Sequence, residues 1–528
     1  MPVVSAAPRS RADLGGVARS GSAGMVGAGV TAVLGAVFTI GVTRGVGAVE
    51  AGVFFSATSV FLLLYTIARL GTGTGAVYFL TRHRALGRPD RLRPTLRVAL
   101  LPVTVLSVVL SAGLFVLAPA ISDLIARGDS DAAVLPLRVL AGFVPLAALS
   151  DLFLAAARGF GRVRPLVLVD KVGRPFAQVA GLGVAVAAGW SVSVALPLVW
   201  AGPYLLSAAV AAVWLGRLVR RAERVGTPDV ADGPPWREFW AFTGPRALGS
   251  VAQIALQRLD IVLVAALAGP AEAALYTAAT RFLVFGQLGG TALGTGVQHR
   301  FGTLFATGDR AAAAELYRTS TAWLMVLTWP LYLLFAVFSP FVLALFGKGY
   351  AVAEPVMVLL ALTMLVATGC GMVDNVLNMA GRTTWTLTNA LLALALDVAL
   401  NFLLVPRIGI LGAAVAWAAA IAANNLLPLA QLGWSMGLHP FGRGTAVAAG
   451  LAVACFGALP LAAAVLAGRT LSVLIGTTVV GVALYGAGLW AARGPLRLAA
   501  LRGIRRRPPP RGGAGVQGSG QDDRQCEG

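Results

Sequence analysis

The sequence has few charged residues and almost no cysteine. Of its 528 residues only 12% are charged and three are cysteines, so neither a disulfide framework nor a metal-ligand spacing is present. A soluble domain of this length would carry about a quarter charged residues. No GxxxxGK[ST] loop occurs, which excludes direct use of ATP by a nucleotide-binding cassette in this chain. We therefore expect neither a soluble protein nor an ATP-driven one.

Long apolar runs take the place of the missing charge. Runs of about 20 residues recur between residues 22 and 492, and each is long enough to cross the hydrocarbon core of a bilayer. In lipid the backbone of a spanning segment bonds only within the protein, so these runs predict helices. We predict an all-α polytopic membrane protein with about fourteen transmembrane helices, at residues 22–43, 51–80, 95–118, 133–157, 165–188, 191–215, 239–267, 271–297, 320–346, 352–380, 384–405, 409–433, 444–467 and 470–492.

The arginines predict which side each connection faces. The net charge of +20 could indicate nucleic acid, but arginine crowds every second connection between the predicted helices and is scarce in the others. The positive-inside rule then makes the arginine-rich face cytoplasmic, so both termini are expected on the cytoplasmic side of the cell membrane. We accordingly read residues 1–21 as a cytoplasmic segment and not a cleaved signal peptide. Residues 493–528 are read as a basic, disordered cytoplasmic tail near anionic lipid.

An internal repeat divides the chain. Residues 50–62 (EAGVFFSATSVFL) resemble residues 272–284 (EAALYTAATRFLV), and a glycine-threonine run follows each. We predict two pseudo-equivalent six-helix lobes, followed by two further helices; chance similarity between apolar helices is the alternative. Parallel repeats of this kind typically hold a substrate at their interface. The predicted parts are an N-lobe at 22–215, a cytoplasmic linker at 216–238, a C-lobe at 239–433 and the last two helices at 444–492.

Three stretches carry a family resemblance: RLDIVLVAALAGPAEAALYTAATRF at 258–282, GKGYAVAEPVMVLLAL at 347–362, and NMAGRTTWTLTNALLALALDVALNFLLVPRIGILGAAVAWAAA at 378–420. In order and spacing they resemble the oligosaccharide flippases (Wzx-type) of the MATE-like (MOP) exporter superfamily. The resemblance implies a non-enzymatic, alternating-access carrier without a cofactor. Its substrate would be a lipid-linked oligosaccharide on undecaprenyl pyrophosphate, moved across the membrane for cell-surface polysaccharide synthesis. Its partners would be membrane lipids, a glycan polymerase and glycosyltransferases, and no nucleic acid.

Two arginines lie deep within one predicted helical hairpin. Arg258 and Arg281 each stand about ten residues from the turn at Gly269-Pro270, roughly 15 Å below the membrane surface. A charge at such depth costs at least about 2.5–3.5 kcal/mol, so it usually faces a cavity, a partner or an anionic ligand. Guanidinium groups suit phosphate oxygens. Alternatively, Arg281 could pair with Asp260 and clamp the hairpin.

The remaining substrate-binding candidates line the helices that the resemblance directs toward a central cavity. Arg69 and Arg246 fall in the cytoplasmic half, where Arg246 could also simply extend to the membrane surface. Together with the hairpin arginines they would form a ladder for an anion. The glutamines expected to bind sugar hydroxyls, unless they only join helices, are Gln253, Gln257 and Gln287.

Acidic and amide side chains at helical spacing are candidates for ion coupling. Asp397 and Asn401 lie four residues apart on one helical face, as do Asp374 and Asn378. Either pair could hold Na⁺ or a proton, and hydrogen bonding between helices is the alternative. Near the start of the predicted helix 165–188, Asp170, Lys171 and Arg174 are expected to form a local ion network.

Other functions are weighed against the flippase. A MATE-type exporter of cationic drugs would prefer an acidic cavity, whereas this one is predicted to be basic. A lipid II flippase also favours a cationic cavity and stays open as an alternative. A glycan polymerase or ligase would need a sizeable outer loop, and the largest predicted outer connection is only residues 119–132.

Overall fold

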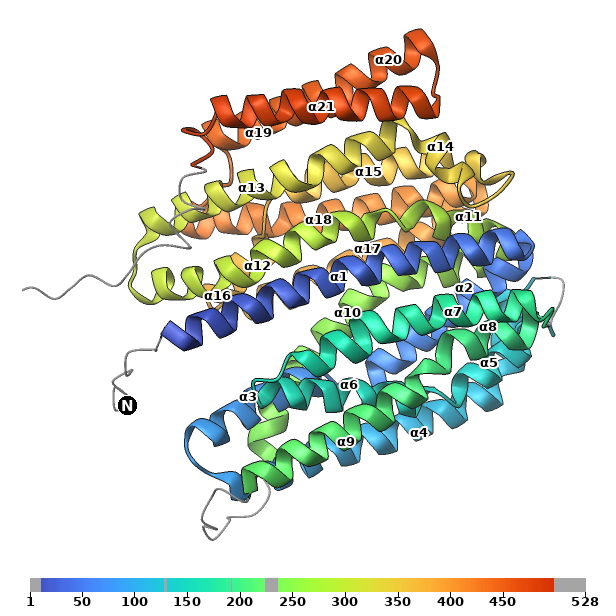
Figure 1. Cartoon of the computed structure of the whole chain (residues 1–528), viewed down its shortest axis with the longest axis vertical. Coiled ribbons are helices and arrows are strands. Elements are labelled where there is room, and N and C mark those ends of the chain that lie inside the picture. The colour runs from blue at the N-terminus through green and yellow to red at the C-terminus, as the bar shows by residue number, and fades with distance from the viewer. Residues whose placement is uncertain (1–10, 128–130, 191, 224–235, 498–528) are drawn as a thin grey trace, which may run out of the picture.

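A computed structural model describes residues 11–127, 131–190, 192–223 and 236–497, and within these ranges the chain is helical without a β-strand (Figure 1). Twelve stretches of the described chain are helices long and apolar enough to cross a membrane. The two predicted spans outside that set, 165–188 and 271–297, are also helical. The prediction of an all-α polytopic membrane protein is confirmed.

The first half of the chain contains helices that are often broken within one span. A break falls where glycine adopts a left-handed conformation, as at Gly71 with φ of 65°. The stretch η2 is a π-helix. The elements are α1 (Arg11–Gly45), α2 (Ala48–Ala68), α3 (Thr72–Ala85), η1 (Pro89–Arg91), α4 (Leu92–Ile125), α5 (Val134–Ala141), α6 (Val144–Gly159), η2 (Leu166–Gly173), α7 (Arg174–Ala187), α8 (Val192–Ala201) and α9 (Pro203–Glu223).

The second half continues in the same way. Its elements are α10 (Trp236–Ala268), α11 (Pro270–Thr280), α12 (Leu283–Ala306), α13 (Arg310–Val337), α14 (Ser339–Ala344), η3 (Tyr350–Ala353), α15 (Glu354–Gly369), α16 (Val373–Met379), α17 (Thr383–Ile408), α18 (Ile410–Met436), α19 (Arg443–Ala452), η4 (Val453–Ala458), α20 (Leu459–Ala467) and α21 (Leu471–Ala491).

Helix ends differ from the predicted boundaries where polar residues continue a helix. Helix α1 begins at Arg11, so about half of the predicted N-terminal segment is helical. Helix α9 runs on to Glu223 and α10 starts at Trp236, so only 224–235 of the predicted linker separates them. These twelve residues, and the tail from 498, lie outside the described residues.

The two repeat-bearing segments lie side by side. Helix α2, which carries the first copy of the repeat, packs along both α10 and α11, and α11 carries the second copy. Helix α1 contacts α7 on one side and α12 on the other, so it runs between the two groups of helices (Figure 1). The division into two six-helix lobes stays a prediction, and "N-lobe" and "C-lobe" below mean residues 22–215 and 239–433.

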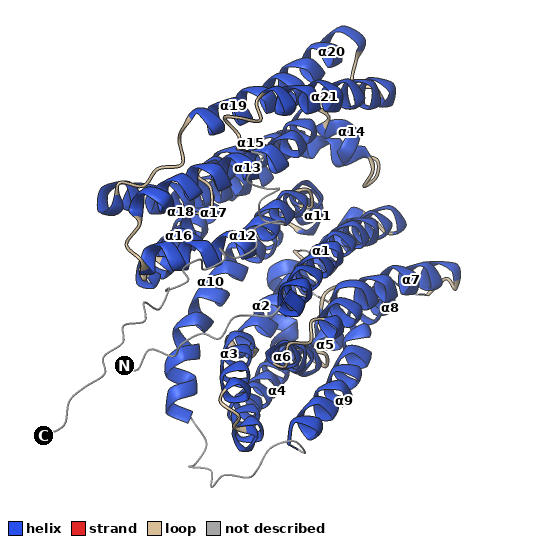
Figure 2. Cartoon of the chain, turned by 60° about the vertical axis from the view of Figure 1, so that its left-hand side comes forward, coloured by secondary structure: helices blue, strands red, loops and turns tan. Residues whose placement is uncertain are grey.

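The last helices, α19–α21, pack on α13 at one side of the molecule (Figure 2). The Tyr485 hydroxyl donates to the Val326 carbonyl at 3.1 Å, and the Trp323 indole donates to the Leu496 carbonyl at 2.9 Å. In the N-lobe the predicted local ion network is confirmed. Asp170 accepts from Arg174 at 2.8 Å and from Lys171 at 2.9 Å.

Candidate functional site

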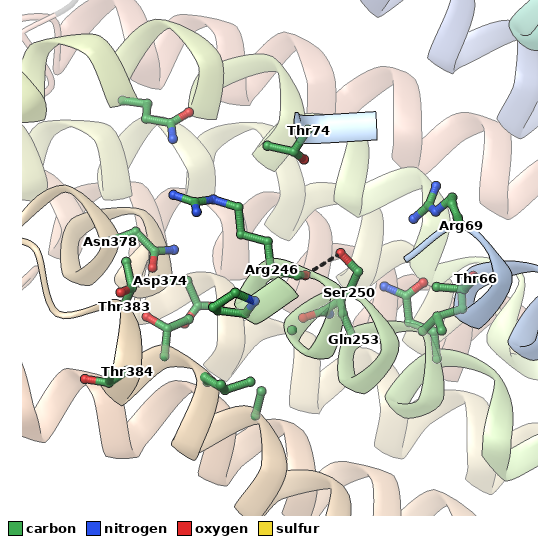
Figure 3. Close-up of a pocket in the computed structure, with 18 of the residues that line it drawn as sticks. Thr66, Arg69, Thr74, Arg246, Ser250, Gln253, Asp374, Asn378, Thr383 and Thr384 are labelled. Atoms are coloured by element: carbon green, nitrogen blue, oxygen red, sulfur yellow. Dashed lines mark hydrogen bonds between the residues drawn. The ribbon is translucent and has the colours of Figure 1, made fainter. Parts of the chain in front are cut away.

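A cavity of about 810 Å³ lies between α2 and α3 on one side and α10, α12, α16 and α17 on the other (Figure 3). Its wall contains four of the predicted substrate-binding residues and one predicted ion-coupling pair. It is rich in hydroxyl and amide groups as well. The polar and charged residues that line it are Tyr65, Thr66, Arg69, Thr74, Arg246, Ser250, Gln253, Gln257, Gln298, Asp374, Asn378, Thr383, Thr384 and Thr386.

Arg69 reaches the cavity from the end of α2. It is the C-cap residue of that helix, and the chain turns sharply after it through Leu70 and Gly71, whose φ values are 50° and 65°. The guanidinium group donates to the Asp151 carboxylate at 3.3 Å and to the Tyr65 hydroxyl at 3.4 Å. Arg69 therefore lines the cavity but already has one acidic partner, which its own helix could not reveal.

Arg246 reaches the cavity from α10, one residue after Pro245 inside that helix. Its guanidinium donates to the Phe242 carbonyl at 2.6 Å and lies 3.8 Å from the centre of the Phe242 ring. The side chain is exposed and forms no ion pair with any residue that the structure describes. In Figure 3 it extends across the space toward Asn378. A cation without a carboxylate partner is thus available to a ligand.

Arg258 and Arg281 lie beyond this cavity and are half-buried. Arg281 lies 5.7 Å from the centre of the Phe55 ring on α2. Within the described chain neither has a salt bridge, and the Nε atom of each is buried without a hydrogen-bond partner. Arg258 on α10 and Arg281 at the end of α11 are thus cations without a carboxylate partner, on two helices that pack on each other.

The alternative for the hairpin, a clamp between Arg281 and Asp260, does not form among the described residues. Asp260 is buried and accepts instead from the Tyr276 hydroxyl at 3.0 Å and from the Asn401 amide at 3.4 Å. Its carboxylate is engaged by α11 and α17 side chains, so Arg281 does not reach it. The periodicity of a single helix fixes which side chains share a face but not which helix they meet, so this pairing stayed open at the level of the sequence.

The candidate ion-coupling pairs occupy different places. Asp374 and Asn378 line the cavity described above. Asp397 and Asn401 are fully buried, and the Asn401 amide donates to the Asp397 carboxylate at 3.2 Å. Because the same amide also reaches Asp260, two carboxyl groups from α10 and α17 share one buried cluster. In the described chain Asp397 Oδ2 and Asn401 Oδ1 have no hydrogen-bond partner.

Sequence reasoning missed Asp260 and Tyr276 as members of this cluster. The available signal was the repeat, which aligns Tyr276 with Phe54, so that the hydroxyl occurs only in the second copy. The structure places the side chains of two of the three predicted glutamines. Gln253 and Gln257 line the cavity, whereas the side chain of Gln287 lies outside the described residues.

The molecule is closed at the end that lies away from the cavity. At the end near Gly269-Pro270, α2 meets α11 so closely that a Cβ on Gly52 would stand 1.7 Å from the Pro270 carbonyl oxygen. Nearby, Arg44 at the end of α1 donates to the Leu345 carbonyl at 2.7 Å. Both contacts join segments that belong to different predicted lobes. The molecule is therefore closed at this end, and the cavity lies toward the arginine-rich end.

One family model identifies the family of the chain, and solved structures show its fold. Residues 17–297 match the family model described as Polysaccharide biosynthesis protein, and residues 245–403 match the MatE model. The comparison with curated proteins gives no match.

Several solved structures have a similar fold. One is the lipid II flippase MurJ in an inward closed conformation, with a TM-score of 0.68 at 12% identity over 91% of this chain and 99% of that one. Another is an inward-facing multidrug resistance MATE family transporter of the MOP superfamily, with a TM-score of 0.62 at 15% identity over 77% and 94%. A MOP superfamily transporter from Pyrococcus furiosus gives 0.55 at 18% identity over 79% and 94%.

Proposed function

Because the chain belongs to the family of polysaccharide biosynthesis proteins and has the fold of MOP superfamily transporters, we propose that it carries a lipid-linked oligosaccharide across the cytoplasmic membrane. The observation that carries this proposal concerns Arg258 and Arg281, on α10 and at the end of α11, two helices that pack on each other. Within the described chain neither has a carboxylate partner, and the Nε atom of each is buried without a hydrogen bond. Such a site calls for an anion of more than one charge, as the pyrophosphate of undecaprenyl pyrophosphate is.

We place the arginine-rich face in the cytoplasm, which makes the closed end at Gly52 and Pro270 the outer one. The cavity with Arg69 and Arg246 then opens inward, and Arg258 and Arg281 lie farther along the path. An anionic head group would meet the cavity arginines first and the hairpin arginines second. Separation of α2 from α11 at Gly52 and Pro270 would release it outward, as alternating access requires.

The charge of the path separates the alternatives. A cationic drug would be repelled by Arg246, Arg258 and Arg281, which disfavours a multidrug exporter. A lipid II flippase would use the same arginines, so lipid II is the second candidate substrate. Neither function needs catalysis by the chain. A glycan polymerase and glycosyltransferases are the proposed partners, because they would consume and supply such a substrate.

We also propose that the buried cluster of Asp260, Asp397 and Asn401 couples transport to a proton or to Na⁺. Oxygen atoms from α10 and α17 converge there, and the Tyr276 hydroxyl from α11 joins them. Two buried carboxyl groups that share one amide donor are costly to ionise together, so a bound cation would stabilise them. Since α11 also packs on α2, a change in this cluster could reach the outer contact.

The proposal is tested in proteoliposomes that contain a fluorescent undecaprenyl-pyrophosphate oligosaccharide. Arg258→Ala and Arg281→Ala should each slow its translocation by about 10-fold or more, because each removes a charge-assisted contact of about 1.5–3 kcal/mol. Arg407→Ala is the matched control, since Arg407 is exposed in the last turn of α17. Wild-type rates in both hairpin variants would overturn the proposal. Competition by unlabelled lipid II tests the second substrate.

A further inference from the structure

A second cavity of about 440 Å³ lies within the C-lobe, between α10, α12, α13, α15, α16 and α18. It is bounded by helices of that lobe alone, whereas the first cavity lies between the lobes. Gln253, Gln257 and Asp374 line both cavities, so the two spaces adjoin. We call the second one the amide chamber, after the five carboxamides that line it: Gln253, Gln257, Asn375, Asn424 and Asn425.

The asparagine amides of this chamber make few hydrogen bonds to the rest of the described chain. Asn424 is 8% exposed and makes no hydrogen bond to another described side chain or backbone group. Asn375 has only a weak contact of 3.7 Å to the sulfur of Met372. Asn425 donates to the Ile421 carbonyl at 2.8 Å, which leaves its own oxygen free as an acceptor. Buried amides are normally hydrogen-bonded, so these groups point to a polar ligand.

The other residues that line the chamber indicate the charge and polarity of a ligand that would fit. Leu324, Met364 and Trp417 supply apolar surface, and Gly290 leaves open space because nothing lies within 4 Å of the Cβ it lacks. Among the described residues that line the chamber there is no lysine or arginine, and Asp374 is the one acid. The chamber therefore suits an uncharged group with both polar and apolar faces. Its volume lies within the range of about 300–1,000 Å³ that is usual for small-molecule sites.

We propose that the amide chamber binds uncharged sugar rings of the transported glycan while the pyrophosphate of the same substrate lies on Arg258 and Arg281. This inference rests on the proposed function. It adds the place in the protein where the glycan would bind. A carboxamide both donates and accepts, as a sugar hydroxyl does, so the five amides match the edge of a ring. The apolar side chains match the C–H faces. Gln253 and Gln257, shared by both cavities, would mark the point where the first sugar leaves the pyrophosphate.

The test measures affinity for two probes on the full-length protein in nanodiscs. One probe is undecaprenyl pyrophosphate without sugar, and the other carries a neutral N-acetylglucosamine disaccharide. Wild-type protein should bind the second more tightly. Asn424→Leu and Asn375→Leu, which keep the branched shape of the side chain but remove its polar atoms, should each reduce that gain by about 3- to 10-fold per lost hydrogen bond, without changing the affinity for the bare lipid. A probe with glucuronic acid in place of the neutral sugar should lose the gain, because it faces Asp374.

The outcomes separate the two proposals. If both asparagine variants keep the full gain from the disaccharide, and their melting temperatures match wild type, the chamber does not bind sugar and the inference fails. Failure of the proposed function looks different: wild type and Arg281→Ala would then bind the bare lipid pyrophosphate equally, whatever the asparagine variants do.

Discussion

The Cα of Gly52 faces the main-chain carbonyl of Pro270 so closely that a Cβ at position 52 would stand 1.7 Å from that oxygen. Both atoms belong to backbone, so neither can rotate away as a side chain does. The contact joins the N-terminal parts of α2 and α11, the two helices related by the internal repeat. Glycine is required there for the closed end of the molecule to form.

Gly52→Val is therefore expected to separate α2 from α11 at this end. Overpacking of this kind typically costs about 1–3 kcal/mol, enough to shift a balanced equilibrium between two conformations. Hydrogen exchange at the start of both helices should become faster, and translocation should fall. Gly35→Val on α1 is the control, because nothing lies within 4 Å of its missing Cβ. Unchanged exchange and transport in Gly52→Val would show that this contact does not act as a gate.

Much of the fold follows from the sequence, and the reason is physical. A long apolar run can only be a helix in lipid, so each predicted span coincides with helical structure, including the π-helical start of 165–188. The helix ends are less predictable. Helix α1 continues outward to Arg11 because arginine, alanine and serine tolerate a helix in water as well as near a membrane surface.

The candidate site is predictable only in part. Depth along a helix places Arg258 and Arg281 at the same level of the hairpin, and the structure shows that the two helices of the hairpin, α10 and α11, pack on each other. Partners on other helices could not be predicted, because spacing within one helix says nothing of which helix packs beside it. For this reason Asp151 could not be assigned to Arg69, and Asp260 could not be assigned to the cluster with Asn401.

Asp151→Asn is expected to strengthen binding of the anionic head group. The carboxylate lies 3.3 Å from the Arg69 guanidinium, and both side chains are 28% exposed, so it competes with a ligand for that cation. Because a partly exposed pair contributes only about 0.2–1 kcal/mol, the gain in affinity should be about 1.4- to 5-fold. Titration with inorganic pyrophosphate on the purified protein measures it. The double variant Asp151→Asn/Arg69→Ala should lose the gain. A gain that survives in the double variant would mean that Arg69 is not the group released.

Asp397→Asn tests the buried cluster separately from the arginines. Neutralising one of two carboxyl groups should abolish the dependence of transport on its coupling ion, whether an imposed proton gradient or Na⁺. Binding of inorganic pyrophosphate should stay unchanged, since the arginines are untouched. Transport in proteoliposomes with and without each ion gradient is the measurement. Asp123→Asn, an exposed acid near the end of α4, is the control. Ion dependence equal to that of wild type in Asp397→Asn would remove the cluster from the mechanism.

The tight turn between α17 and α18 provides a test of packing alone. A Cβ on Gly412 would lie 2.6 Å from the Leu404 carbonyl carbon and oxygen, and 2.8 Å from the Val405 nitrogen. All three are backbone atoms, so Gly412→Ala forces the two helices apart and should destabilise the fold by about 1–3 kcal/mol. Gly433→Ala on the same helix meets nothing within 4 Å and should raise stability slightly, because alanine is the better helix former. Thermal melting of both variants in detergent compares them directly. Since α17 carries Asp397 and Asn401, a lower melting temperature in Gly412→Ala should be accompanied by weaker ion dependence of transport, and an intact ion dependence would show that the cluster tolerates a displaced helix end.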